Sequence, residues 1–196
     1  MNRRDVLCGA GALAAGLALP WPAAAGEDLP DPRREDARLD ALVHLIDPRL
    51  DLVNAHTGER LRAAFFGGTG YSRPAIETAN WFMRDWRQKE GRQMDVRLYW
   101  ALAALRQAAQ AEGHDGQIVF LSGYRTRATN DLLRRQGIGA ARNSFHLRAR
   151  AVDFVIPGVP VATVAGYAEW LQVGGTGHYP GNFVHIDTGG ARTWIG

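Results

Sequence analysis

The segment RAVDFVI, residues 150–156, constrains the fold of this chain more than any other part of the sequence. Successive side chains of a strand point to opposite faces of its sheet, and here both faces are apolar except at Asp153. A strand of this composition belongs in the interior, where an unpaired carboxylate costs several kcal/mol. We therefore expect a positive partner for Asp153, and either an arginine or a metal cation would meet that need.

A second apolar segment, FVHID at residues 183–187, carries a histidine in the same way. His185 and Asp187 share one face of this predicted strand. If the two strands are neighbours, His185 and Asp153 can approach within about 5 Å. His146, on the loop seven residues before Asp153, could fold back over the same groove. Two imidazoles and one carboxylate, with a fourth position left to water, form a catalytic zinc site, which lowers the pKa of the bound water to about 7 and polarises a carbonyl.

The remaining pattern predicts an α+β fold with a small, largely antiparallel sheet and helices packed on it. Apolar periodicity and turn residues predict a strand hairpin at 49–66, helices at 73–88, 96–113, 126–137 and 160–174, and strands at 117–125, 150–158 and 182–189. We expect a loop at 141–148, a glycine-rich loop at 174–181 and a tail at 190–196.

The N-terminal residues 1–25 have the layout of an export signal, with a charged head, an apolar run and a small-residue cleavage site. The pair Arg3 and Arg4 resembles a twin-arginine signal, which implies a periplasmic protein. The apolar run is too short for a convincing membrane span, so we expect none in the mature protein, with a retained anchor as the alternative. Residues 26–48 have the composition of a linker or N-terminal arm, which leaves 49–196 as the zinc peptidase-like domain.

Charge and cysteine content narrow the class of partner. The formal net charge is +3, and it falls to +2 without residues 1–25, which hold two Arg and one Asp. This small positive charge does not indicate a protein that binds nucleic acid. The single cysteine, Cys8, leaves with the signal, so an exported domain of this kind rests on its core and on any metal it binds. The sequence does not indicate an oligomeric state.

Three segments, taken in order, resemble the D-Ala-D-Ala carboxypeptidase/hedgehog zinc metallopeptidase superfamily, and within it the murein endopeptidase K-like branch. They are SGYRTRATNDLL (122–133), NSFHLRARAVDF (143–154) and GGTGHYPGNFVHIDTG (174–189). The stretch NAHTGE (54–59) is also similar to that branch, so the likeness runs from about Leu52 to residue 196.

The resemblance implies a hedgehog/DD-peptidase-like fold and Zn2+ held by His146, Asp153 and His185. It also implies that the substrate is a stem peptide of peptidoglycan, and that Arg125 and Ser144 help to seat or polarise it near the metal. Arg125 has a carboxylate-binding chemistry of its own, but it could equally form an ordinary surface ion pair. Ser144 could instead cap a turn.

The sequence has no general base at either of the two positions where members of this superfamily carry one. Carboxypeptidases of this superfamily carry a glutamate three residues before the last zinc histidine, and relatives with a His-x-His pair carry a histidine two residues before it. Here those positions are Asn182 and Phe183. The catalytic candidates are Asp187, which could orient His185 or take the proton of the water, and His178 in the glycine-rich loop, as an acid or base.

We therefore predict a zinc-dependent endopeptidase that hydrolyses peptide cross-links of peptidoglycan. Three alternatives stay open. The first is a metal-bearing module that binds wall peptides without cutting them, and the second is a D,D-carboxypeptidase. The third is a metal-free structural domain in which an arginine neutralises Asp153.

Overall fold

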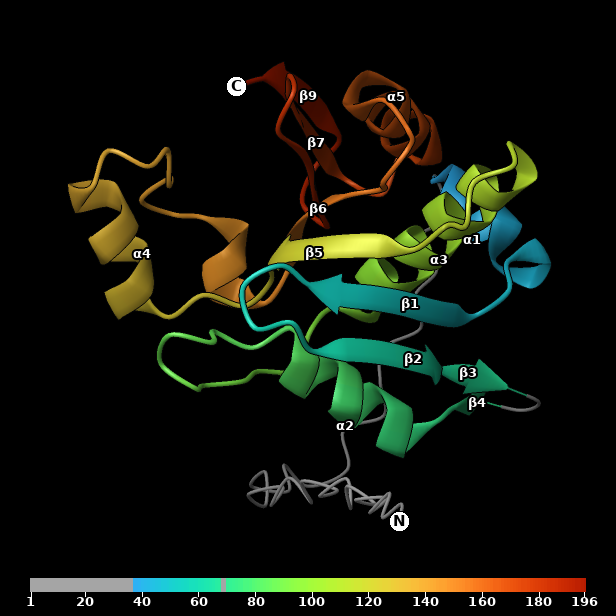
Figure 1. The fold of residues 1–196 in the computed structure, drawn as a ribbon, viewed down its shortest axis with the longest axis horizontal. Helices are drawn as coiled ribbons and strands as arrows, with labels where there is room; N and C mark the ends of the chain where they lie inside the picture. Colours follow the sequence, from blue (N-terminus) through green and yellow to red (C-terminus); the bar gives the residue numbers. More distant parts are fainter. Residues whose placement is uncertain (1–36, 68–69) are drawn as a thin grey trace, which may run out of the picture.

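The computed structural model describes residues 37–67 and 70–196 (Figure 1). The predicted export signal and residues 26–36 of the predicted arm lie outside the described residues. The helices are α1 (Arg38–Leu42), α2 (Arg73–Phe82), α3 (Val96–Ala111), α4 (Arg127–Arg135), α5 (Val161–Leu171) and the 3-10 helices η1 (Val43–Leu45) and η2 (Phe145–Arg148). The strands are β1 (Arg49–Asn54), β2 (Arg60–Ala64), β3 (Phe66–Gly67), β4 (Gly70–Tyr71), β5 (Ile118–Ser122), β6 (Ala151–Val155), β7 (Gly175–Tyr179), β8 (Phe183–Asp187) and β9 (Arg192–Ile195).

Seven strands form one sheet, in the order β2-β1-β5-β6-β8-β7-β9. The pairs β1–β5 and β7–β9 are parallel, and the other neighbouring pairs are antiparallel. The predicted α+β class is confirmed. The sheet is mixed, however, and with seven strands it is not the small sheet that we expected.

The two additional strands lie in segments that we predicted to be a loop and a tail. The glycine-rich stretch contains β7, and residues 192–195 of the tail form β9. Glycine weakens a strand by itself, but β7 is paired along both edges, with β8 on one side and β9 on the other. Pairing with neighbours thus outweighs the low strand propensity of this segment.

One face of the sheet packs against α3 and α5. Val152 and Phe154 of β6 and Val184 and Ile186 of β8 are all fully buried in this core. Because side chains alternate along a strand, this packing turns Asp153 and its neighbours on β8 to the opposite face of the sheet. The core therefore positions the candidate site.

Part of the predicted arm packs on the domain. Leu39 of α1 is fully buried in the core, and the Asp40 carboxylate accepts a hydrogen bond of 2.5 Å from the buried Arg97. The polar, proline-bearing composition of the residues before it led us to assign this segment to the arm, although residues 39–46 contain several apolar side chains that pack on the core.

Helix α2 is shorter than predicted and ends at Phe82 instead of residue 88. The carboxylate of Asp85 accepts hydrogen bonds from the backbone N–H groups of Arg87 and Gln88, a local arrangement that competes with a helix. Among the described residues, no helix combines the length and the apolar character needed to cross a membrane.

Candidate metal centre

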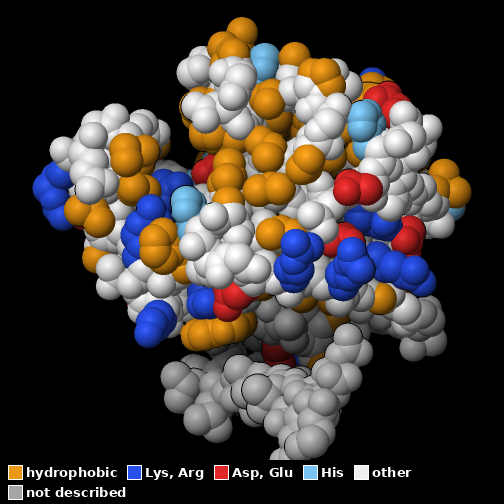
Figure 2. Space-filling view, viewed as in Figure 1, with side chains coloured by type: hydrophobic (Ala, Val, Ile, Leu, Met, Phe, Trp, Pro, Cys, Tyr) orange, Lys and Arg blue, Asp and Glu red, His pale blue; other side chains and the backbone are white. Residues whose placement is uncertain are grey.

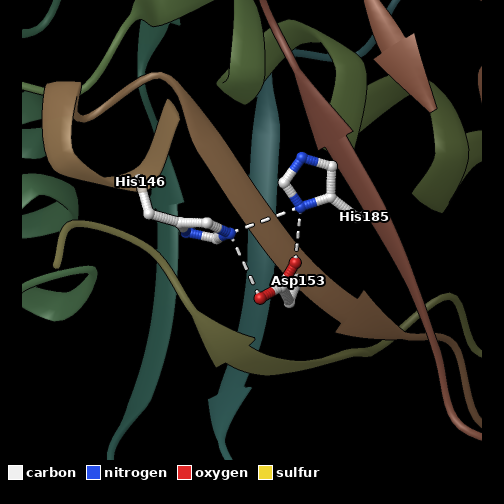
Figure 3. Close-up of side chains that lie close together, drawn as sticks. All are labelled: His146, Asp153 and His185. Atoms are coloured by element: carbon white, nitrogen blue, oxygen red, sulfur yellow. Dashed lines mark hydrogen bonds and ion pairs between the residues drawn. The ribbon is translucent and has the colours of Figure 1, made fainter. Parts of the chain in front are cut away.

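His146, Asp153 and His185 meet on the face of the sheet that points away from α3 and α5 (Figure 3). His146 Nε2 lies 3.2 Å from Asp153 Oδ2 and 3.3 Å from His185 Nδ1. His185 Nδ1 lies 2.7 Å from Asp153 Oδ1. One ligand atom from each residue is therefore within 4.8 Å of the others, and all three side chains are nearly buried.

Strand pairing brings Asp153 and His185 together. In the antiparallel pair of β6 and β8 they are directly opposite residues, so their side chains share one face. His146 comes from η2, whose first turn is capped by Ser144 Oγ, which accepts from His146 N at 3.3 Å. Ala149 then adopts a left-handed conformation (φ 55°), which turns the chain from η2 into β6.

The hydrogen bonds of the two imidazoles fix where their lone pairs point. His146 Nδ1 lies 2.7 Å from the carbonyl oxygen of Gly123, which can only accept, so Nδ1 carries the proton. His185 Nε2 lies 3.3 Å from Asp187 Oδ2, and this carboxylate likewise requires a proton on Nε2. When both imidazoles are neutral, the remaining nitrogens, His146 Nε2 and His185 Nδ1, present lone pairs to the same space as the Asp153 carboxylate.

Three electron-rich atoms facing one another repel unless a positive charge lies between them. Burial alone would raise the pKa of Asp153, but the two neighbouring histidines hold it well below its usual range. Burial lowers the pKa of His146 despite Asp153. For His185, hydrogen bonds to Asp153 and Asp187 outweigh the effect of burial and raise the pKa to about 9. The cluster thus holds a positive charge, either a proton on His185 or a cation that displaces it, and the donor set of two imidazoles and a carboxylate suits a divalent metal.

Arg125 lies beside this space and not within it. Its Nη2 is 3.7 Å from Asp153 Oδ2, farther than either histidine nitrogen, and it donates to Ser122 Oγ at 3.1 Å. A bulge in β5 turns Ser122 opposite Asp153. Burial lowers the pKa of Arg125 while Asp153 opposes that change. The arginine alternative is therefore present as a flanking contact, and it leaves the space between the three ligand atoms free for a cation.

The other predicted substrate contact, Ser144, lies at the start of η2. Its oxygen accepts the backbone N–H of His146, so the turn-capping alternative is what the structure contains. The same hydroxyl retains its own proton and is only partly buried. It could therefore also donate to a ligand beside His146.

Asp187 is fully buried, and its carboxylate is saturated with hydrogen-bond donors. It accepts from the backbone of Gly175 and Gly189, from Arg192 through two nitrogens, and from His185. Burial would raise its pKa, but His185 and Arg192 hold the pKa well below its usual range. A carboxylate in this state orients an imidazole well and takes up a proton poorly.

The structure does not bring His178 to the site. It lies on β7 opposite Val184, whereas Gly177 is the residue opposite His185. Because directly opposite residues share a face, His178 belongs to the face of Val184, on the other side of the sheet from the metal ligands.

Sequence reasoning missed two aromatic residues, Trp194 beside the ligand His185 and Tyr179 beside Trp194. The ring centroid of Trp194 on β9 is 5.3 Å from that of His185, and Trp194 Nε1 donates to the hydroxyl of Tyr179 at 3.2 Å. A Cβ at Gly177 would come within 2.6 Å of the Trp194 ring, so the glycine is what allows this close approach. Both residues could have been found only by predicting the strands that carry them, β7 and β9. We predicted those segments to be a loop and a tail.

Two imidazole nitrogens and a carboxylate, presented by neighbouring strands and a short helix, define a metal centre of the kind that metal-dependent hydrolases use. Comparison with known proteins identifies the family. The family model described as peptidoglycan L,D-endopeptidase MepK matches residues 46–194, and the chain belongs to this peptidase family. The family resemblance predicted from the sequence is confirmed.

Named relatives are similar over most of their length. The peptidoglycan L,D-endopeptidase MepK of Escherichia coli (strain K12) is 36% identical over 194 residues, which cover 98% of this chain and 97% of the relative. The probable peptidoglycan L,D-endopeptidase MepK of Haemophilus influenzae is 39% identical over 158 residues, which cover 80% of this chain and 84% of the relative. No solved structure matches the chain.

Proposed function

We propose that this protein is a zinc-dependent endopeptidase that hydrolyses peptide cross-links of peptidoglycan, and that these include the L,D-bonds after which its relatives are named. The observation that carries the proposal is the convergence of His146 Nε2, His185 Nδ1 and the Asp153 carboxylate on one space, with the other nitrogen of each imidazole bonded to a separate acceptor. Once His185 gives up the proton on Nδ1, the three groups present only acceptors to this space, and such an arrangement suits a metal cation.

The proposed ligands are His146, Asp153 and His185, and the metal is Zn2+. Zinc bound there would lower the pKa of a coordinated water to about 7 and polarise the scissile carbonyl. Asp187 keeps His185 in the tautomer that leaves Nδ1 free to bind, which is a positioning role. We assign His178 no part in the chemistry, since its strand position places it on the other face of the sheet.

Arg125 and Ser144 are the proposed substrate contacts. The guanidinium of Arg125 is held by Ser122 and by Asn130, and it flanks the ligand cluster. Figure 2 shows one face of the molecule, on which Lys and Arg side chains lie among apolar and acidic ones. A stem peptide is rich in carboxylates and amide carbonyls, and both accept hydrogen bonds from a guanidinium. The hydroxyl of Ser144 would add a donor beside His146.

We further propose a hedgehog/DD-peptidase-like fold, because the three characteristic segments lie on the strands β5, β6 and β8, which are neighbours in the sheet, and on the segments beside them. Peptidoglycan lies outside the cytoplasmic membrane, so the substrate requires an exported protein. The sequence of residues 1–25 supports export through the twin-arginine route to the periplasm.

Purified mature protein incubated with defined cross-linked muropeptides, and followed by mass spectrometry, tests the proposal. We expect dimers to be split into monomers, about one zinc per chain by metal analysis, and loss of both in His185→Ala. Release of terminal D-alanine alone would identify a D,D-carboxypeptidase. Bound zinc with no new fragments would identify a binding module. An undiminished metal content in His185→Ala would refute the ligand assignment.

A further inference from the structure

Tyr179, the last residue of β7, lies on the same face of the sheet as the metal ligands. Gly177 is opposite His185 in the strand register, and Tyr179 is opposite Phe183, so the face is shared. The rings of Tyr179 and Phe183 are stacked, with centroids 4.3 Å apart and planes at 17°. This stacking fixes the direction in which the phenol points.

The phenol oxygen is held from the side of the metal centre. Trp194 Nε1 donates to it at 3.2 Å, and the same indole ring lies against His185, with ring centroids 5.3 Å apart. Since Gly177 has no side chain, nothing from β7 separates the Trp194 ring from the sheet at that point. The hydroxyl of Tyr179 is thus linked to the ligand His185 through a single rigid ring.

A phenol that accepts an N–H bond still has its own proton to donate. The hydrogen bonds of the described residues include none donated by Tyr179, and the side chain is only partly buried. On the other side of the cluster, Arg125 Nη2 lies 3.7 Å from Asp153 Oδ2. The face of the sheet that carries the metal ligands therefore holds two hydrogen-bond donors, Arg125 beside Asp153 and the Tyr179 hydroxyl behind the Trp194 ring that lies against His185.

We propose that Tyr179 is a catalytic residue that donates a hydrogen bond to the carbonyl oxygen of the scissile amide. The proposal rests on the proposed function. During hydrolysis a water oxygen bonds to the carbonyl carbon and the carbonyl oxygen gains negative charge. The C–N bond then breaks, and its electron pair and one proton of the attacking water go to the nitrogen. Tyr179 keeps its proton throughout. Its hydrogen bond strengthens as charge builds on the oxygen, so it lowers the barrier more than it improves binding.

The test is Tyr179→Phe, which removes the hydroxyl and keeps the ring that stacks on Phe183. Loss of one such donor lowers kcat by roughly 100- to 1,000-fold. We expect a fall of that order in kcat for cleavage of a cross-linked muropeptide, with KM and bound zinc close to those of the wild-type protein. The matched control is Tyr167→Phe on α5, whose hydroxyl donates to Glu112 at an exposed position and which should leave kcat unchanged.

The outcomes separate this role from the proposed function. A Tyr179→Phe variant with kcat within about twofold of wild type would overturn the role of Tyr179 alone, since loss of an oxyanion donor costs far more. A fall in activity that follows a loss of bound zinc, or that appears only in KM, would also overturn it, because the hydroxyl would then act on the metal site or on binding. A wild-type protein that cleaves no muropeptide would overturn the proposed function and this role together.

Discussion

Replacing Asp187 by asparagine tests whether the buried carboxylate behind His185 sets the metal-binding tautomer. Asp187 Oδ1 accepts from Gly189 N at 2.8 Å, from Gly175 N at 3.2 Å and from Arg192 Nη1 at 3.1 Å. Oδ2 accepts from Arg192 Nη2 at 2.5 Å and from His185 Nε2 at 3.3 Å. Every partner of this carboxylate is therefore a donor.

An amide has one oxygen and one NH2 group, so it cannot satisfy this environment in either orientation. With its oxygen toward Gly175 and Gly189, the introduced amide would present its NH2 group to His185 Nε2–H. His185 would then move its proton to Nδ1 in order to accept from the amide, and the lone pair needed by a metal would be lost. The change is almost isosteric, which makes it a test of hydrogen-bond polarity and not of volume.

The expected magnitude follows from these contacts. Arg192 is partly exposed and can turn its freed N–H toward water, but His185 Nε2 is buried and cannot. Leaving one buried donor without a partner costs about 1–3 kcal/mol. This agrees with the loss of roughly 10- to 100-fold in metal affinity that follows removal of a partner behind a metal-binding histidine. We therefore expect Asp187→Asn to weaken zinc binding by about 10- to 100-fold.

The assay is competition for zinc against a chromophoric chelator, with thermal unfolding measured in parallel to show that the variant is folded. The control is Asp131→Asn on α4, a partly exposed carboxylate 3.8 Å from Arg134, which should change the zinc affinity by less than about twofold. A folded Asp187→Asn protein with the zinc affinity of the wild type would show that the carboxylate does not set the tautomer of His185.

Two further predictions concern pH and export. Because the pKa of His185 is raised to about 9, a metal ion must displace a proton from its Nδ1 at neutral pH. The zinc affinity should therefore rise by up to about tenfold per pH unit between roughly pH 7 and 9, and it should fall as the pH is lowered below 7. Calorimetry in buffers of different ionisation enthalpy would detect about one proton released at pH 7, and an affinity independent of pH over this range would contradict the assignment. Replacing both Arg3 and Arg4 by lysine should leave the precursor in the cytoplasm, as seen by cell fractionation, if export uses the twin-arginine route; unchanged export would argue against it.

The sequence was informative where a single polar side chain stands in an apolar strand. An apolar strand with a single carboxylate needs a positive partner, and a histidine in a second apolar strand can meet it only if the strands are neighbours. Asp153 and His185 are directly opposite residues in the observed sheet, so this reasoning predicted a long-range contact. The approach of His146 to Asp153 was also predictable, because only a short segment separates His146 from β6.

The role of His178 was not predictable in the same way. Its segment has several glycines, and we interpreted it as a loop able to bring the imidazole over the metal. The strand β7 exists because β8 and β9 pair with it, and that pairing fixes His178 on the opposite face. The full set of hydrogen bonds to the Asp187 carboxylate could not be predicted either. Its donors include Arg192 on β9, a strand that we did not predict in the tail.

The place of β9 in the sheet has a consequence for how the protein is made. The three ligand residues all precede Arg192 and Trp194 in the chain, so a nascent polypeptide on the ribosome holds every metal-binding group before it holds the counter-ion of Asp187 or the ring against His185. A chain cut after β8 would keep the ligands but lose both supports. Proteolytic removal of β9 would therefore leave all three ligand residues in the chain while taking away the groups that support His185 and one of the two strands that pair with β7.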